Sequence, residues 1–371
     1  MDLQRSLMLG LAAVTIAAQA FAEPVFVGIG ALESGRPSQV AAVSRDGRVV
    51  VGQSVYTGQD GPVLQATSWT LAGGMTGLGI PDGRFRSMAQ GVSADGSVIG
   101  GITLADGFRW TSSTGTQSVP GTLNGNIWGV SGNGQYLVGE VTDTQLPFAR
   151  RAFRWSEAGG LQELGFIDGS QSATARGVNG DGSVIVGSSV LPSSPGVLTE
   201  AFRWTESGGM VNLGSLSGHP RGSVAYRVTT DGSIVVGSVS HSSLAEVAFR
   251  WTAADGMVAL GAHPSGGGTV ATGVSADGNV IVGTAAGDFG FIWTPAGRVA
   301  DMKSYFLQLG LSQVAGWTLY DNFDVSDDGR VIVGTGVNPE GRIEGFYAVI
   351  PAPGAIVPLA LGALLASRRR R

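Results

Sequence analysis

The sequence predicts an all-β fold, a seven-bladed β-propeller closed by its N-terminal strand. Three observations predict it: a unit built on Gly-Val-Ser-x-Asp-Gly-x-Val-Ile-Val-Gly occurs seven times, each unit divides into four short strands, and the last unit lacks a strand that the N-terminus can supply. The aspartate of the unit, an asparagine in one copy, is at positions 46, 95, 133, 181, 231, 277 and 328. Five of the six spacings between these positions are 46 to 51 residues, close to the length of a propeller blade. The alternative is a β-helix, a solenoid of repeats, whose coils are normally shorter.

Composition agrees with a folded β protein rich in turns. Of the 371 residues 43% are hydrophobic and only 14% are charged, which excludes a disordered chain. The 61 glycines follow no triplet period, so they indicate tight turns rather than collagen. Because the chain has no cysteine, a disulfide framework, a thiolate metal site and a cysteine nucleophile are excluded.

The fourth unit illustrates how each repeat divides into strands. A first strand ends at Val178, and Asp181-Gly182 makes a hairpin turn, because glycine accepts a positive φ and aspartate can bond its own backbone. The β-branched run at 184–186 is the second strand, and Phe-Arg-Trp at 202–204 lies in the third. A Gly-Gly turn leads to the fourth strand at 210–214. Four short strands joined by tight turns and repeated are typical of a propeller blade.

The third strands carry an aromatic residue once per blade, and six of the eight tryptophans occupy this one position. A residue required by every blade is better explained by packing between blades than by a ligand platform. We expect the arginines of these strands to lie along their own blades and to pair with a repeat aspartate; they are Arg109, Arg154, Arg203 and Arg250.

The seventh unit predicts how the ring closes. It has a third strand at 345–349 but no fourth strand after it. The missing strand resembles residues 25–32 at the other end of the chain, so we expect the N-terminal strand to complete the last blade. An open solenoid would instead need capping repeats at both ends.

Both ends of the chain have the pattern of targeting segments. Residues 1–22 combine basic Arg5, an apolar run and Ala20-Phe21-Ala22 before Glu23, which predicts a secretory signal peptide rather than a buried helix. The repeats then occupy 23–350. Residues 351–371 form a tail with an apolar run at 355–366, short for a full span but able to engage a membrane. Around that run lie Pro351, Ala352, Pro353, Arg368, Arg369, Arg370 and Arg371.

Charge excludes one class of partner. Without Asp2, Arg5 and the four terminal arginines, the 23 basic and 28 acidic residues fall to 18 and 27, a net charge of −9. Nucleic-acid binding needs a basic surface that releases counterions, so nucleic acid is not expected as a partner.

The tail resembles the PEP-CTERM sorting signal of exosortase-processed bacterial surface proteins, although Ala352 stands where the usual motif has glutamate. The repeats resemble the extracellular HAF-repeat family, through Ala-Phe-Arg-Trp at 152–155, 201–204 and 248–251. The final repeat from Gly316-Trp317 to Gly341 also fits that family. The resemblance implies export, with signal peptidase and an exosortase-like protease as partners. It places the protein at the cell surface, outer membrane or extracellular matrix, anchored transiently or permanently. The family has no established activity to transfer.

A search for catalytic chemistry finds no catalytic motif, metal site or cofactor motif. The histidines His219, His241 and His263 lack metal-ligand spacing, and we interpret them as solvated loop residues. Asp-Gly recurs without the alternating ligands of a calcium loop, so turn chemistry explains these aspartates. The sequence therefore favours a non-enzymatic binding or structural module whose ligand is a polysaccharide or a protein. The alternative is a propeller hydrolase or lyase acting on extracellular polysaccharide.

Candidate binding residues are those at which the repeats differ. The connections from strand two to three and from strand four to the next blade vary in length and meet on one face, where binding residues gather on rigid scaffolds. That face would hold Arg84, Arg86, His219, Arg221 and His263, and a short helix at 301–309 that covers the ring. A second set of candidates consists of the residue two positions before the valine that ends each innermost strand. Its members are Ala41, Gln90, Trp128, Arg176, Tyr226, Thr272 and Phe323, which could bind a sugar or simply fill the channel.

Overall fold

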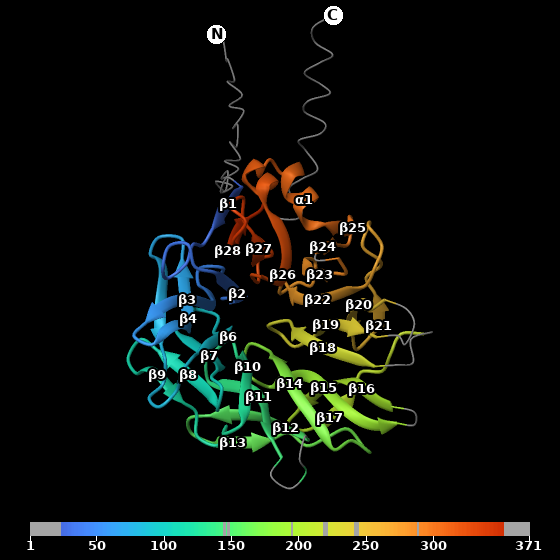
Figure 1. Cartoon of the computed structure of the whole chain (residues 1–371). Helices are drawn as coiled ribbons and strands as arrows, with labels where there is room; N and C mark the ends of the chain where they lie inside the picture. The colour runs from blue at the N-terminus through green and yellow to red at the C-terminus, as the bar shows by residue number, and fades with distance from the viewer. Residues whose placement is uncertain are drawn as a thin grey trace, which may run out of the picture.

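Seven four-stranded antiparallel sheets surround a central channel, as the computed structural model in Figure 1 shows. The structure describes residues 24–351 except 144–145, 147–148, 194–195, 218–221, 241–244 and 288. The predicted signal peptide and the tail beyond Pro351 lie outside the described residues. The prediction of a seven-bladed β-propeller is confirmed, and the β-helix alternative is wrong.

Within each of the first six sheets the strands follow chain order from the channel outward. Blades one to three consist of β2 (Ser38–Val43), β3 (Val50–Gly58), β4 (Gly61–Thr70) and β5 (Gly74–Gly79); β6 (Met88–Val92), β7 (Val98–Ile102), β8 (Gly107–Thr111) and β9 (Gly115–Ser118); and β10 (Gly125–Val130), β11 (Tyr136–Thr142), β12 (Arg150–Ser156) and β13 (Gly160–Glu163).

Blades four to six repeat the pattern. They consist of β14 (Ser172–Val178), β15 (Val184–Ser193), β16 (Gly196–Thr205) and β17 (Gly209–Asn212); β18 (Ser223–Val228), β19 (Ile234–Val239), β20 (Val247–Thr252) and β21 (Gly256–Ala259); and β22 (Thr269–Val274), β23 (Ile281–Ala285), β24 (Phe289–Thr294) and β25 (Arg298–Asp301). In blades one and four the second and third strands lengthen into a projecting hairpin, where a loop was expected.

The N-terminal strand completes the seventh blade. This blade contains β26 (Thr318–Val325), β27 (Val331–Val337) and β28 (Ile343–Val349), and β1 (Val25–Gly28) pairs antiparallel with β28 as its outermost strand. Phe26 of β1 packs on Phe346 with ring centroids 5.2 Å apart, and on Trp317 at 5.4 Å. The predicted strand exchange is therefore confirmed.

The repeated Ser-x-Asp-Gly string forms one hydrogen-bonded turn in each blade. In the first blade the Ser44 hydroxyl donates to Asp46 Oδ1 (2.6 Å), which also accepts from the Arg48 N–H (3.0 Å), and Ser44 Oγ accepts from the Val49 N–H (2.9 Å). In the second blade, hydrogen bonds from Ser97 hold the pKa of Asp95 below its usual value. Turn chemistry therefore accounts for the repeat aspartates. We call the face that carries these turns the turn face and the opposite face the variable face.

A β-bulge in the innermost strand explains the last glycine of the repeat. Cross-strand pairing skips one residue in each of the first six blades, and in blade three Ile127 and Gly129 are paired but Trp128 is not. The bulge brings the Asn126 carbonyl over Gly139 of the second strand, where a Cβ would lie 1.8 Å from that oxygen. A bulge re-aims one side chain out of the regular pleat. The skipped residues are Ala41, Gln90, Trp128, Arg176, Tyr226 and Thr272.

The hydrophobic core lies between adjacent blades. Trp69 of blade one packs against Tyr347 of blade seven, with ring centroids 5.1 Å apart, and both belong to a cluster that spans the closure. The interpretation of the repeated tryptophan as core is confirmed. The expected pairing of the third-strand arginines with repeat aspartates is wrong for Arg154, which bonds the Gly182 carbonyl and Glu206 of the next blade and lies over Trp204. The guanidinium thus joins two blades.

The predicted helix is present, but it does not cover the ring. Helix α1 (Met302–Gln308) begins at Asp301, whose carboxylate accepts from the Ser304 N–H (2.7 Å), and a 3₁₀ turn, η1 (Ser312–Gly316), follows. Met302 and Phe306 are buried in the core cluster shared by blades six and seven. Figure 1 shows α1 at the outer edge beside β25, where its apolar side extends that core.

Candidate functional site

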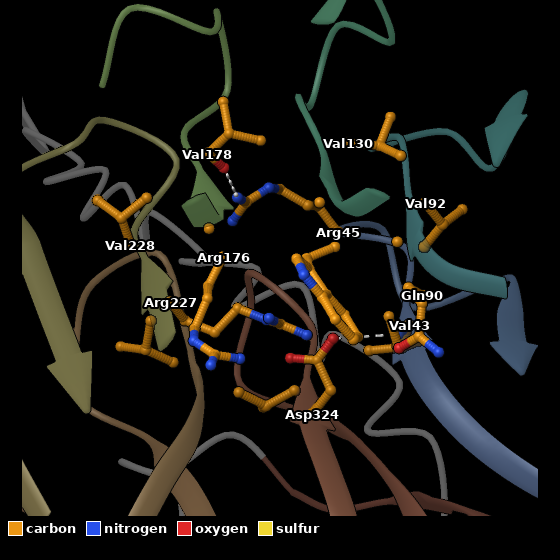
Figure 2. Close-up of a pocket in the computed structure, with 17 residues that line it drawn as sticks. Val43, Arg45, Gln90, Val92, Val130, Arg176, Val178, Arg227, Val228 and Asp324 are labelled. Atoms are coloured by element: carbon orange, nitrogen blue, oxygen red, sulfur yellow. Dashed lines mark hydrogen bonds between the residues drawn. The ribbon is translucent and has the colours of Figure 1, made fainter. Parts of the chain in front are cut away.

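The central channel holds a cavity of about 60 Å³. Its wall consists largely of innermost-strand residues from around the ring, Trp128 among them. Figure 2 labels four others: Gln90, Arg176, Arg227 and Asp324. Organic ligands usually occupy pockets of about 300–1,000 Å³. The cavity therefore has room for a few waters or a small ion, and not for a sugar ring.

Arg45 crosses the channel on the turn-face side of this cavity. Its guanidinium donates to the Val178 carbonyl of blade four (3.3 Å) and pairs with Asp327 of blade seven (3.1 Å). Asp327 also accepts from the Thr230 hydroxyl of blade five (2.6 Å), and its N–H donates to the Arg45 carbonyl (2.9 Å). Side chains of blades one, five and seven and a backbone carbonyl of blade four are therefore linked across this mouth of the channel.

The side chains at the position two before each innermost valine do not all point into the channel. Gln90, Trp128 and Arg176 line the cavity together, and Tyr226 lies beside them with its ring 5.3 Å from the Arg176 guanidinium carbon. Phe323 points away from the channel: it is 1% exposed and packs against Phe346 and Gly334 inside blade seven. The pairing of β26 is irregular at this point, which explains why the sequence position did not predict its direction.

Trp128 is fixed by a buried carboxylate. Its indole N–H donates to Glu140 of the neighbouring strand, and the Asn126 amide donates to the other oxygen of Glu140 (2.8 Å). Glu140 is 5% exposed, and burial raises its pKa despite these two donors and the nearby Arg176. Trp128 is thus held in place as part of the channel wall and is not free to rotate onto a ligand.

Sequence reasoning missed Arg45, Arg227 and Asp324. Arg227 and Asp324 occupy the position before the innermost valine, which in the other blades is Ala42, Gly91, Gly129, Gly177 and Gly273. Two charged residues at a position that is otherwise glycine or alanine were a signal in the sequence that could have identified Arg227 and Asp324. Asp324 accepts from the Val43 N–H (3.1 Å), and burial raises its pKa although Arg227 lowers it.

On the variable face, Arg84 is engaged in a partly buried ion pair. It binds Asp106 through Nε (3.0 Å) and Nη2 (2.5 Å), and thereby joins the 80–87 connection to the 103–106 loop. Burial opposes the ionised form of Asp106, but the bonds from Arg84, Thr103 and Ser118 outweigh it and lower the pKa. The Arg84 guanidinium therefore rigidifies these loops. Arg86, two residues on, has a buried Nε without a hydrogen-bond partner among the described residues.

The two loops that Arg84 joins, and the connection between β9 and β10 beside them, carry exposed apolar side chains. Phe85 is 85% exposed, Leu104 is 64% exposed and Leu123 is 67% exposed, and we call these three the blade-two patch. The Asn124 N–H donates to the Ala105 carbonyl (2.6 Å), so the loops of Leu104 and Leu123 are adjacent. A surface hollow of about 470 Å³, partly lined by Leu123, continues the patch toward blade three.

His263 is buried, so its interpretation as a solvated loop residue is wrong. It is 4% exposed, its Nδ1 lies 2.7 Å from the Ser265 hydroxyl, and its ring is stacked on Phe289. Burial lowers the pKa of His263, and the Asp301 carboxylate 3.8 Å from Nε2 only partly offsets this. His219 and Arg221 lie outside the described residues, and so does His241.

His263 predicts a pH dependence of stability. Because the pKa of His263 is lower in the folded state, the unfolded chain takes up a proton at a higher pH than the folded chain does. Stability should therefore fall as the pH drops below about 6.5, the usual histidine pKa. We expect His263→Gln to reduce this loss, measured as the free energy of unfolding in urea from about pH 7.5 to 5. Equal slopes for the two proteins would contradict the assignment.

Within the described residues, no group of three or more histidine, aspartate or glutamate side chains is placed to hold a metal ion. None of the helices in the described ranges is long and apolar enough to cross a membrane.

Comparison with solved structures decides the fold. The chain has 14% identity to an oligogalacturonate lyase in complex with manganese, covering 89% of this chain and 97% of that one, with a TM-score of 0.56. The β-propeller domain of the Trilobed protease from Pyrococcus furiosus has 10% identity over 84% of this chain and 95% of that one, with a TM-score of 0.53. The chain is a β-propeller.

A second oligogalacturonate lyase, from Vibrio parahaemolyticus, has 12% identity and covers 89% of this chain and 98% of that one, with a TM-score of 0.57. At these identities the likeness concerns the fold alone. No protein-family model matches the sequence, and no curated protein does. The Trilobed protease propeller is described as having an open velcro topology. This propeller is closed by β1, so the two differ at the ring closure.

Proposed function

We propose that this propeller is an exported binding module, held at the cell surface by its C-terminal tail, and that it binds a protein partner through the blade-two patch. The observation that carries the proposal is the exposure of Phe85, Leu104 and Leu123 on loops held rigid by Arg84–Asp106 and by the Asn124–Ala105 backbone bond. Contiguous apolar surface on a rigid scaffold marks interaction sites with proteins or membranes.

The position of the chain ends supports a protein partner rather than the membrane as occupant of this patch. Val25 pairs with Val349, so both ends of the described chain lie together on the turn face. Leu104 lies on the variable face, in the loop between β7 and β8. A tail that engages the membrane from Pro351 onward therefore directs the blade-two patch away from the bilayer. The small volume of the channel cavity argues against a polysaccharide threaded through the ring.

The absence of cysteine allows a direct test. Leu104→Cys labels the patch, and Val258→Cys, 51% exposed on the outer strand of blade five, is the matched control. We expect a membrane-impermeant maleimide to modify both on intact cells, with Cys at 104 reacting several-fold more slowly than in the purified protein and Cys at 258 reacting equally. Labelling only after lysis would contradict export. Equal rates at 104 would contradict the partner.

A shortened chain tests the anchor. A chain that ends at Ile350 keeps the buried Ile350 side chain and its N–H bond to the Arg330 carbonyl (2.7 Å), so the propeller should remain folded. We expect this shortened chain in the medium and the full chain on the cells. Retention of both would exclude the tail as the anchor.

A further inference from the structure

The channel cavity contains more guanidinium groups than carboxylates that are free to pair with them. Arg45 is matched by Asp327, which forms its ion pair and also binds Thr230. Among the described residues Arg176 and Arg227 have no ion pair within 4.0 Å, although both line the cavity. Figure 2 shows the Arg227 side chain extending toward Asp324, with Arg176 beside it.

Arg176 is positioned and yet unsatisfied. Its guanidinium lies over the Tyr226 ring, and its Nε is buried without a hydrogen-bond partner in the part of the chain that the structure describes. Buried polar groups usually have a partner, and each exception needs an explanation. Glu140, the nearby carboxylate, already accepts from Trp128 and Asn126. The wall therefore leaves a donor without a protein acceptor.

Arg227 and Asp324 have a related arrangement. Arg227 donates to the Tyr226 carbonyl (3.3 Å), and Asp324 accepts from the Val43 N–H (3.1 Å). Burial raises the pKa of Asp324, and its Oδ2 is already occupied by the Val43 N–H. Both residues occupy a position that is glycine or alanine in the other five blades. The channel therefore contains two charged side chains where the other blades have a small residue.

We propose that the channel cavity binds one small oxyanion, a carboxylate group or an ion of the size of phosphate or sulfate, between Arg176 and Arg227. The planar guanidinium matches the two oxygens of a carboxylate or phosphate. A volume of about 60 Å³ admits such a group but excludes a sugar.

The experiment measures thermal unfolding of the purified chain against sulfate, phosphate and acetate, with ionic strength held constant by chloride. Sulfate also stabilises proteins by exclusion from their surface, without saturation. We therefore expect a saturable rise in Tm for at least one of the three ions, and the ion that saturates at the lowest concentration identifies the ligand class. A purely linear response to all three would overturn the proposal.

Variants separate the site from general effects. Arg176→Gln should lower the affinity for the anion by about tenfold or more, because a hydrogen bond to a charged group contributes free energy on that scale. Arg48→Gln, whose side chain is 84% exposed, should leave affinity unchanged. Asp324→Asn keeps an acceptor for the Val43 N–H and removes a negative charge, so it should tighten binding. If Arg176→Gln does not fold, Asp324→Asn decides. Unchanged affinity in Asp324→Asn, or in a folded Arg176→Gln, would indicate an adventitious ion only.

Discussion

Phe26→Ala is expected to cost about 3–5 kcal/mol of folding stability, the range for removal of a buried aromatic side chain. Phe26 is 3% exposed and packs against Phe346, Trp317 and Phe306, which lie in the third strand of the last blade and in the helical segment before it. The variant removes the main apolar contact by which the N-terminal strand holds the ring closed. Urea unfolding with equal m-values measures the change.

Phe85→Ala is the matched control for this prediction. It makes the same substitution at a side chain that is 85% exposed, so its effect should stay within about 0.5 kcal/mol. If the two variants unfold at the same urea concentration, β1 does not close the propeller by burial of Phe26.

Gly139→Ala is expected to destabilise the protein by about 3 kcal/mol or more, because overpacking against backbone cannot be relieved by a rotamer change. A Cβ at this position would lie 1.8 Å from the Asn126 carbonyl oxygen and 3.1 Å from the Ile127 Cα. The innermost strand would have to move or lose its bulge, and that bulge directs Trp128 out of the regular pairing. Thermal unfolding and the near-ultraviolet circular dichroism of the tryptophans report both effects.

Gly159→Ala provides the comparison on the same blade. Its Cβ would meet only the Ser156 hydroxyl at 3.1 Å, at an exposed turn. The cost should therefore stay below about 0.5 kcal/mol. Equal losses of stability in the two variants would show that the close backbone approach at the bulge is not the reason for glycine at position 139.

The repeat string predicted the blade, the turns and the core because each of these depends on local pattern. Asp46 and its equivalents form the same turn in every copy, and Trp69 with its equivalents lies where a once-per-blade aromatic residue must pack. The candidate site was predicted less well. Gln90, Trp128 and Arg176 line the cavity, whereas Phe323 is buried in its blade and Arg84 is bound to Asp106.

The sequence by itself determined the number of blades, the strand order and the closing strand. These follow from repeat spacing and from one strand missing at one end and present at the other. Only the tertiary structure decided which side chains meet. Arg45 of blade one reaches Val178 of blade four and Asp327 of blade seven, residues brought together by ring closure. Such contacts depend on the radius of the channel and on the direction each bulge gives its side chain, and neither is encoded in the periodicity of one repeat.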